Sequence, residues 1–350
     1  MKYFNRFLAP LFLLTISLPV YAVGPTYVKD AVVAPTTWTK EDSPYILQND
    51  ITVSKGVVLT IAPGAEVRFV ASNGGANGAG PNLIIQGGLK AVGTSVDPIQ
   101  FNPAVAGSFW GAIYFGNSDS PNCVLQACLI KGGRIVCNNA SPLITQCAIF
   151  GAKSSIEVEM NSAPQIVGNR ITANGIAISL LADTASPIIT GNEIYNNNYG
   201  FYIRDFGAPN VSGNKIYGNV KYNIVNSSTK SLSMPNNDFQ TTDAQQIMRT
   251  IYDGAYNPSI GRVTFTPYVG MQTMQASAAM PGMPGAAQPS QTQAVQEQPK
   301  IQQEDLWSYG RPFDAMKISN VEAQKKKPSS VVKILAVGAT AVVTVVLLFL

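Results

Sequence analysis

The chain of 350 residues contains no histidine, and only 13% of its residues are charged. It therefore lacks the side chain most often used as a general base and the most common protein ligand of transition metals. The formal net charge of +4 gives no indication of nucleic-acid binding. Glycine and proline are instead abundant, with 30 and 23 residues, and this turn-rich composition argues against a helical protein.

The N-terminal 22 residues have the pattern of a secretory signal peptide. Basic Lys2 and Arg6 precede an apolar run, and Val20-Tyr21-Ala22 places small residues at a cleavage site. We therefore expect an exported protein of the cell envelope, in the periplasm or at the cell surface, whose mature chain begins near Val23. An uncleaved N-terminal anchor is the alternative, although the apolar run is short for a membrane span.

Residues 331–350 predict a C-terminal transmembrane helix, because they are apolar apart from Lys333 and long enough to cross a bilayer. The protein is then anchored in a membrane. Basic residues lie only before this stretch, on the exported side, which runs against the positive-inside tendency. A terminal segment that is cleaved, or buried in an assembly, is the alternative.

Residues 271–330 predict a low-complexity linker and a juxtamembrane segment. Residues 271–302 are rich in Met, Ala, Gln and Pro with few charges, a composition typical of a disordered spacer. Residues 303–324 add Leu306, Trp307, Tyr309 and Phe313. This stretch is either a plain juxtamembrane segment, which is the simpler interpretation, or a short docking segment.

A unit of about 22 residues repeats within the central region, where it is marked by proline. The repeated prolines are Pro142, Pro164, Pro187 and Pro209. Four columns of like residues follow these prolines at fixed offsets. They are an aliphatic column (Ile144, Ile166, Ile189, Val211), a Cys or Asn column (Cys147, Asn169, Asn192, Asn214), an Ile column (Ile149, Ile171, Ile194, Ile216) and a second Asn column (Asn174, Asn197, Asn219). Leu125, Cys128 and Ile130 precede the pattern, and Met234, Asn237 and Phe239 continue it.

A unit this short cannot bury its own apolar face, so successive units must stack. Short alternating runs predict half-buried strands, and parallel strands about 4.8 Å apart place like residues above one another. Residues 23–270 are therefore predicted to form an all-β domain, a parallel β-helix of about nine coils. The stacked Asn side chains are expected to hydrogen-bond from coil to coil rather than to bind a ligand.

The irregular N-terminal half carries motifs that resemble a known superfamily. They are Trp38, then V-x-L-T-I-A-P-G (57–64), L-I-I-Q-G-G-L-K-A-V-G-T (83–94), P-I-Q-F (98–101) and W-G-A-I-Y-F (110–115), with 251–269 as a closing segment. Together they resemble bacterial envelope proteins with right-handed parallel β-helix domains of the pectate-lyase-like and NosD-like superfamily. The resemblance implies the handedness of the helix, and either a polysaccharide-cleaving enzyme or a binding or structural module. N-D-F-Q at 237–240 departs from the N-N-W-W-G of many relatives.

A lyase of this superfamily would use acidic Ca²⁺ ligands and a basic proton abstractor. The weak candidates are Asp183 and Asp205 as ligands and Arg204 or Lys215 as base. Both aspartates lie four residues before a repeat proline, but the segments before those prolines differ in length, so their alignment is uncertain. A solvated or capping role is the simpler interpretation. We expect no metal and no cofactor, with Ca²⁺ required only by the lyase alternative.

The four cysteines, Cys123, Cys128, Cys137 and Cys147, all fall within 25 positions, 123–147. Export permits disulfides, and Cys128 and Cys147 share a column one coil apart. Cys123 with Cys137 is the other candidate pair. Stacked, buried thiols are the alternative, and the spacing does not match a zinc site.

An aromatic column supplies the best binding hypothesis. One residue after each inward Ile of the Ile column comes Phe150, Thr172, Tyr195 or Tyr217, and at this odd step the side chain should face outward. With Tyr199 and Tyr202 on the same coils, Tyr195 and Tyr217 are predicted to bind sugar rings or a protein partner. Packing of stacked rings without a ligand is the alternative.

We therefore expect an exported, membrane-anchored β-helix acting as a non-enzymatic structural or binding module. Its expected partners are the membrane, through the C-terminal helix, and a polysaccharide or an envelope protein. No nucleic-acid partner is expected. The alternative is a polysaccharide lyase or another carbohydrate-active enzyme.

Overall fold

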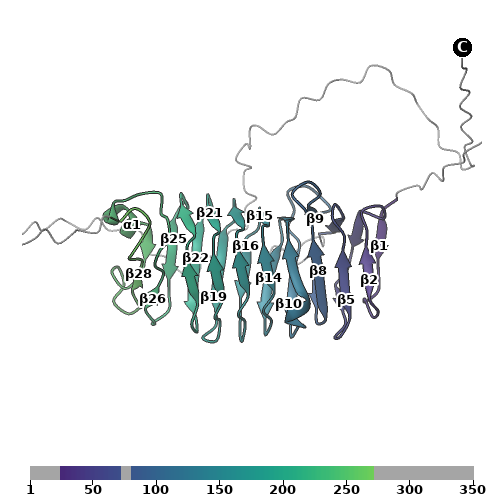
Figure 1. Cartoon of the computed structure of the whole chain (residues 1–350), viewed down its shortest axis with the longest axis horizontal. Helices are drawn as coiled ribbons and strands as arrows, with labels where there is room; N and C mark the ends of the chain where they lie inside the picture. Colours follow the sequence, from purple (N-terminus) through teal and green to yellow (C-terminus); the bar gives the residue numbers. More distant parts are fainter. Residues whose placement is uncertain (1–23, 72–79, 272–350) are drawn as a thin grey trace, which may run out of the picture. The chain divides into compact units, whose positions relative to one another are not determined.

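The computed structural model describes residues 24–71 and 80–271. These residues form a right-handed parallel β-solenoid of about nine coils, as the sequence and its resemblance predicted. The strands stack in sequence order from β1 to the C-terminal end (Figure 1). The predicted signal peptide, linker and transmembrane helix lie outside the described residues, within which no helix is long and apolar enough to cross a membrane.

Three parallel sheets form the walls of the solenoid. Sheet A contains β1 (Thr26–Val28), β3 (Tyr45–Leu47), β6 (Glu66–Phe69), β9 (Ile99–Pro103), β12 (Cys128–Lys131), β15 (Ala148–Phe150), β18 (Arg170–Thr172), β21 (Glu193–Tyr195) and β24 (Lys215–Tyr217). Sheet B contains β4 (Ile51–Val53), β7 (Leu83–Ile85), β10 (Ala112–Gly116), β13 (Arg134–Asn138), β16 (Ser154–Val158), β19 (Ile176–Leu181), β22 (Tyr199–Asp205), β25 (Tyr222–Asn226) and β27 (Ile251–Tyr252). Sheet C contains β2 (Thr36–Trp38), β5 (Val58–Ile61), β8 (Gly88–Val92), β11 (Cys123–Gln126), β14 (Leu143–Thr145), β17 (Gln165–Val167), β20 (Ile188–Thr190) and β23 (Asn210–Ser212). A 3₁₀ turn (Ser120–Asn122) precedes β11.

The predicted columns are in register. Ile144, Ile166, Ile189 and Val211 are paired along sheet C, and Ile149, Ile171, Ile194 and Ile216 along sheet A. All eight side chains are buried in one continuous apolar core. Burial of the same column in every coil explains why the repeat keeps an aliphatic residue there.

Two asparagine ladders line the corners of the coils. In the first, the Nδ2 of Asn169 donates to the Oδ1 of Asn192 at 3.0 Å, and Asn192 donates in the same way to Asn214 at 2.9 Å. Asn237 ends this ladder. Asn174, Asn197 and Asn219 form the second. The predicted structural role of both Asn columns is confirmed.

The two ends of the solenoid are closed differently. At the N-terminal end, the ring of Trp38 stacks on Tyr45 with centroids 4.8 Å apart. At the C-terminal end, β27 extends sheet B, and β28 (Val263–Thr264) pairs with β26 (Leu232–Ser233). Helix α1 (Ala244–Arg249), begun by an Asp243 side chain that accepts from the backbone N–H of Gln245, packs against β27. The sequence predicted the closing segment 251–269 but not this helix.

A carboxylate on the outer face of sheet B is nearly covered. The Glu157 side chain is 12% exposed and accepts from Arg134 Nη1 at 3.2 Å. Burial raises the pKa of Glu157, and the attraction of Arg134 offsets this only in part. Folding therefore favours the protonated acid.

Replacing Glu157 by glutamine is expected to raise Tm near neutral pH. A carboxyl group with a raised folded-state pKa destabilises the fold above that pKa, and the penalty disappears below its unfolded-state pKa. The gain should therefore vanish as the pH falls to about 4, the ordinary range for glutamate. Thermal melts across pH measure it, with exposed Glu41→Gln as control. A difference in Tm that is the same at every pH contradicts this assignment.

Candidate functional site

The outer face of sheet A carries the predicted aromatic column. Phe150, Thr172, Tyr195 and Tyr217 face one another on adjacent strands, and each is partly exposed. The rings of Tyr195 and Tyr217 are nearly parallel, with an interplanar angle of 5° and centroids 5.4 Å apart. The predicted register and outward direction of this column are thus observed, and part of it is a ring stack.

Thr172 interrupts the aromatic column. It lies between Phe150 and Tyr195, which are therefore two strand spacings apart, or about 10 Å. A flat ring held at van der Waals contact of about 3.5–4 Å on each face needs about 7–8 Å between its neighbours. The short threonine side chain thus leaves a gap in the aromatic column between Phe150 and Tyr195, which we call the slot.

A charged column runs beside the aromatic one on the same strands. Arg170, Glu193 and Lys215 face one another in register, and an isolated bridge places Asp238 next. Arg170 Nε lies 3.5 Å from Glu193 Oε2, and the Arg170 side chain remains 64% exposed. Within the described residues, Lys215 forms no ion pair. The column therefore offers exposed cationic donors next to the slot.

Glu193 connects the charged and aromatic columns. The Tyr217 hydroxyl donates to Glu193 Oε1 at 2.9 Å. Desolvation first, and then the Glu193 carboxylate, raise the pKa of Tyr217, so this hydroxyl stays protonated and holds the ring in place. Because the ion pair with Arg170 is exposed, it contributes little to stability by itself.

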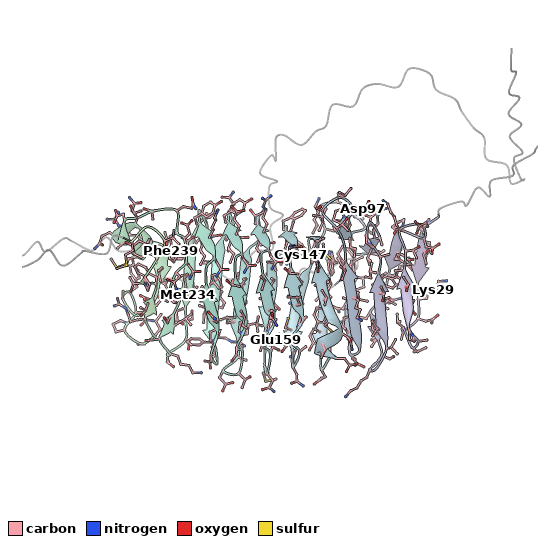
Figure 2. All side chains as sticks on the ribbon, viewed as in Figure 1. Lys29, Asp97, Cys147, Glu159, Met234 and Phe239 are labelled. Carbon is pink, nitrogen blue, oxygen red and sulfur yellow. The ribbon has the colours of Figure 1, made fainter. Side chains whose placement is uncertain are left out.

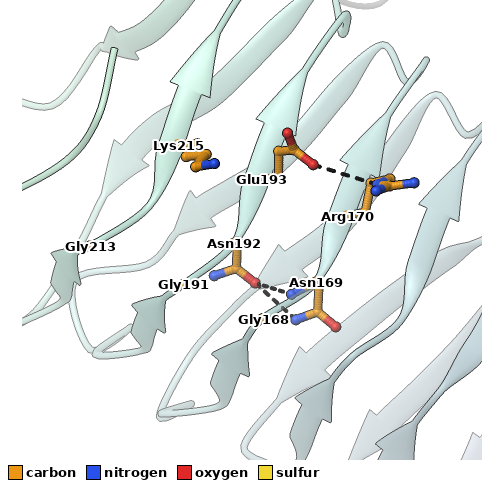
Figure 3. Close-up of a pocket in the computed structure, with 8 residues that line it drawn as sticks. All are labelled: Gly168, Asn169, Arg170, Gly191, Asn192, Glu193, Gly213 and Lys215. Atoms are coloured by element: carbon orange, nitrogen blue, oxygen red, sulfur yellow. Dashed lines mark hydrogen bonds and ion pairs between the residues drawn. The ribbon is translucent and has the colours of Figure 1, made fainter. Parts of the chain in front are cut away.

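A polar depression of about 450 Å³ adjoins these columns at the corner between sheets C and A. Figure 3 shows its lining: Gly168, Asn169, Arg170, Gly191, Asn192, Glu193, Gly213 and Lys215. The three glycines have φ of 66°, 66° and 69°, a left-handed conformation that favours glycine. Because they carry no side chains, the corner is open to an approaching ligand.

Lys215, Tyr195 and Tyr217 were predicted from the sequence as candidate site residues, whereas Arg170, Glu193 and the glycines were missed. Both missed features could have been found in the repeat. Glycine precedes the Asn column at 168, 191 and 213, and a charged residue of alternating sign follows it at 170, 193, 215 and 238.

Comparison with protein families agrees with this architecture. A family model described as "Right handed beta helix region" matches residues 102–239. These residues are a right-handed β-helix region. The match includes every strand of the slot and the depression. No curated protein and no solved structure showed a match to the chain.

The β-helix separates the four tyrosines that were predicted to act together. Tyr195 and Tyr217 lie on sheet A, whereas Tyr199 and Tyr202 lie on β22 of sheet B. Tyr199 is also only 2% exposed, packed with Tyr222 and Val225. They therefore belong to two different surfaces of the β-helix.

Three of the four candidate lyase residues lie near sheet B, on or beside β19 and β22, whereas the fourth lies on sheet A. Asp205 is paired with Leu181 across an irregularity in sheet B, whereas exposed Asp183 lies two residues further along, in the turn after β19. Asp205 accepts from Lys230 Nζ at 2.9 Å, and this contact lowers its pKa. Arg204 donates to the Leu181 carbonyl at 3.0 Å, while Lys215 lies on sheet A. No group of three or more His, Cys, Asp or Glu in the described residues is arranged to hold a metal ion.

All four cysteines of the β-helix are free and buried in this structure. Cys128 and Cys147 follow each other in the column that asparagine occupies later, with Cys147 near the middle of the stack (Figure 2). The Cys147 N–H donates to Asn169 Oδ1 at 2.9 Å, so the thiols continue the ladder as small apolar groups. Burial raises the pKa of Cys137 well above its usual range. Oxidation of either predicted pair to a disulfide stays a prediction.

Proposed function

We propose that the chain is an exported, membrane-anchored, non-enzymatic binding module that holds a polysaccharide against the outer face of sheet A. The observation that carries the proposal is the slot over Thr172, between the aromatic side chains of Phe150 and Tyr195. A pyranose ring fits this spacing and would stack on both walls. Arg170, Lys215 and Glu193 stand beside the slot as donors and acceptors for sugar hydroxyls.

The repeat favours an extended ligand over a small molecule. Adjoining coils present similar columns, so a chain of sugar residues can meet the ring stack and the charged column in succession. The depression at the glycine corner gives the same chain a second region of contact. No cofactor is needed for binding of this kind. A lyase has less support, because Asp205 is paired with Lys230, Arg204 donates to a backbone carbonyl, and Lys215 lies on another sheet.

Filling the slot provides the sharpest test. Thr172→Tyr would extend the ring stack and occupy the space for a sugar ring, so binding should weaken while Tm is maintained. Two aromatic contacts of about 0.5–1.5 kcal/mol each predict that Kd rises about tenfold or more. Retention on acidic and neutral polysaccharides measures it, together with absorbance of unsaturated products.

Thr60→Tyr is the matched control, because Thr60 is equally half-buried but lies on β5 of sheet C, in the N-terminal coils. It should bind like the unchanged protein, and Tyr195→Ala should lose affinity as Thr172→Tyr does. The proposal is wrong if Thr172→Tyr binds as well as Thr60→Tyr, or if the unchanged protein binds no polysaccharide. Release of unsaturated products would support the lyase alternative instead.

A further inference from the structure

A second aromatic surface lies on the outer face of sheet B, and we call it the tyrosine cluster. Its members are Ile176, Tyr199, Tyr202, Tyr222, Val225, Tyr252 and Tyr256. It is separate from the apolar core inside the β-helix. The rings of Tyr222 and Tyr252 meet edge to face at 5.8 Å, and Tyr252 and Tyr256 stack at 6.0 Å. These residues come from the last coils, on β19, β22, β25 and β27 and the turn that follows.

The cluster combines a buried base with an accessible rim. Tyr199, Tyr222 and Val225 are 2%, 5% and 1% exposed, whereas Ile176, Tyr202 and Tyr252 are only partly buried around them. The coil before Ile176 has Ser154 in its place. The tyrosine cluster therefore begins at Ile176, and in the column of Tyr202 it is separated from Val136 of the earlier coils by Glu157 and Ser179. A contiguous apolar patch on an outer wall, rimmed by polar residues, is typical of an interaction site.

We infer that the tyrosine cluster binds a segment of the same chain, residues 303–313. This segment holds Leu306, Trp307, Tyr309 and Phe313, whereas residues 272–302 contain no aromatic residue at all. Its apolar side chains match the chemistry of the cluster. Acidic Glu304 and Asp305 directly precede Leu306, and the cluster carries a cation, Lys221, whose Nζ lies 5.4 Å from the centre of the Tyr199 ring.

The length of the chain also suits this partner. The described residues end at Met271, in the C-terminal part of the β-helix to which Tyr252 and Tyr256 also belong. If residues 272–305 form the spacer that their composition predicts, its root-mean-square span would be about 30–35 Å, whereas adjacent coils lie only about 4.8 Å apart. Because the segment and the cluster belong to one chain, the effective concentration of the segment at the cluster is on the order of millimolar. The cluster would therefore be occupied even if it bound the segment weakly.

Binding would have a mechanical consequence. With residues 303–313 held on sheet B, the free chain between the β-helix and the predicted membrane helix shortens to residues 314–330. This inference does not depend on polysaccharide binding at sheet A, because it uses different residues on another wall.

Trp307 is a natural reporter for the test. The full chain has three tryptophans, and Trp38 and Trp110 are buried at 4% and 2% exposure. In the full-length protein in detergent, we expect Trp307 to be protected from acrylamide quenching, with Trp307→Phe giving the background. Tyr202→Asp with Tyr252→Asp should raise quenching of Trp307 several-fold, and so should Leu306→Asp, which leaves the β-helix unchanged.

Tyr27→Asp is the control, because Tyr27 is 53% exposed on β1 at the other end of the β-helix. It should leave Trp307 protected. Free quenching of Trp307 in the unchanged protein would overturn the inference. Protection that survives both the tyrosine and the Leu306 variants would assign it to the micelle, and protection that grows with protein concentration would assign it to a second copy. Either result rejects binding within one chain.

Discussion

Replacing Asn192 by alanine is expected to lower the free energy of unfolding by roughly 2–6 kcal/mol. Its Oδ1 accepts from both the backbone N–H and the Nδ2 of Asn169, at 2.9 and 3.0 Å. Alanine would leave the Asn169 backbone N–H and one of its two Nδ2 hydrogens unpaired inside the β-helix, at about 1–3 kcal/mol each, while the other hydrogen keeps its bond to the Ile144 carbonyl. Asn192 is 1% exposed, so water cannot replace the lost acceptor. Since domains are stable by only about 5–15 kcal/mol, this variant approaches unfolding.

Urea denaturation measures the effect, and Asn210→Ala is its matched control. Asn210 is exposed on β23, where its Oδ1 accepts only from the Ser212 hydroxyl, at 3.1 Å. Its replacement should change stability by less than about 0.5 kcal/mol. Similar midpoints for the two variants would mean that the ladder contributes no more than an exposed amide, which contradicts its assigned role.

Gly133→Ala is expected to cost about 3–5 kcal/mol by displacing Trp110. A Cβ at Gly133 would lie 2.0 Å from Cε2 of the Trp110 ring. That ring cannot move aside, because it stacks on Phe69 with centroids 3.8 Å apart and its Nε1 donates to the Lys131 carbonyl at 2.7 Å. Forcing the ring out therefore resembles deleting a buried tryptophan, and the estimate is the cost of such deletions.

A double-mutant cycle isolates this steric cause. Gly133→Ala should have almost no effect on Tm when Trp110 is already alanine, because the clash is then gone. Gly24→Ala is the control for the substitution itself, since no atom lies within 4 Å of its added Cβ. Equal costs of Gly133→Ala in both backgrounds would show that something other than Trp110 fills this space.

Much of the fold could be predicted because it repeats. The interval between Pro142 and Pro164 equals one coil, so residues at equal offsets had to stack, and sheets A and C show this register. The short strands around Gly56 and Pro63-Gly64 were also predicted, and appear as β4, β5 and β6. Helix α1 was not predicted, because it lies beyond the repeat and its six residues give too short a pattern.

The candidate site was only partly predictable. The aromatic column follows from the offsets, but Thr172 was treated as a member rather than as a gap. That a small residue between Phe150 and Tyr195 leaves room for a ring depends on the spacing of strands. Arg170 and Glu193 were overlooked because each is unremarkable alone, and only their alignment across coils gives a continuous charged column.

The sequence by itself determined the coil, its inward aliphatic columns and its asparagine ladders, because these depend only on intervals that recur along the chain. The tertiary structure decided which wall each outward residue occupies. Tyr195 and Tyr199 are four residues apart, yet Asn196, with φ of 54°, turns the chain between them from sheet A to sheet B. Likewise, the unequal segments before Pro187 and Pro209 place Leu181, not Asp183, beside Asp205. The intervals between repeated residues determine which way a side chain points within a strand. The change of direction at a corner and the path of a loop of unequal length are instead set by packing.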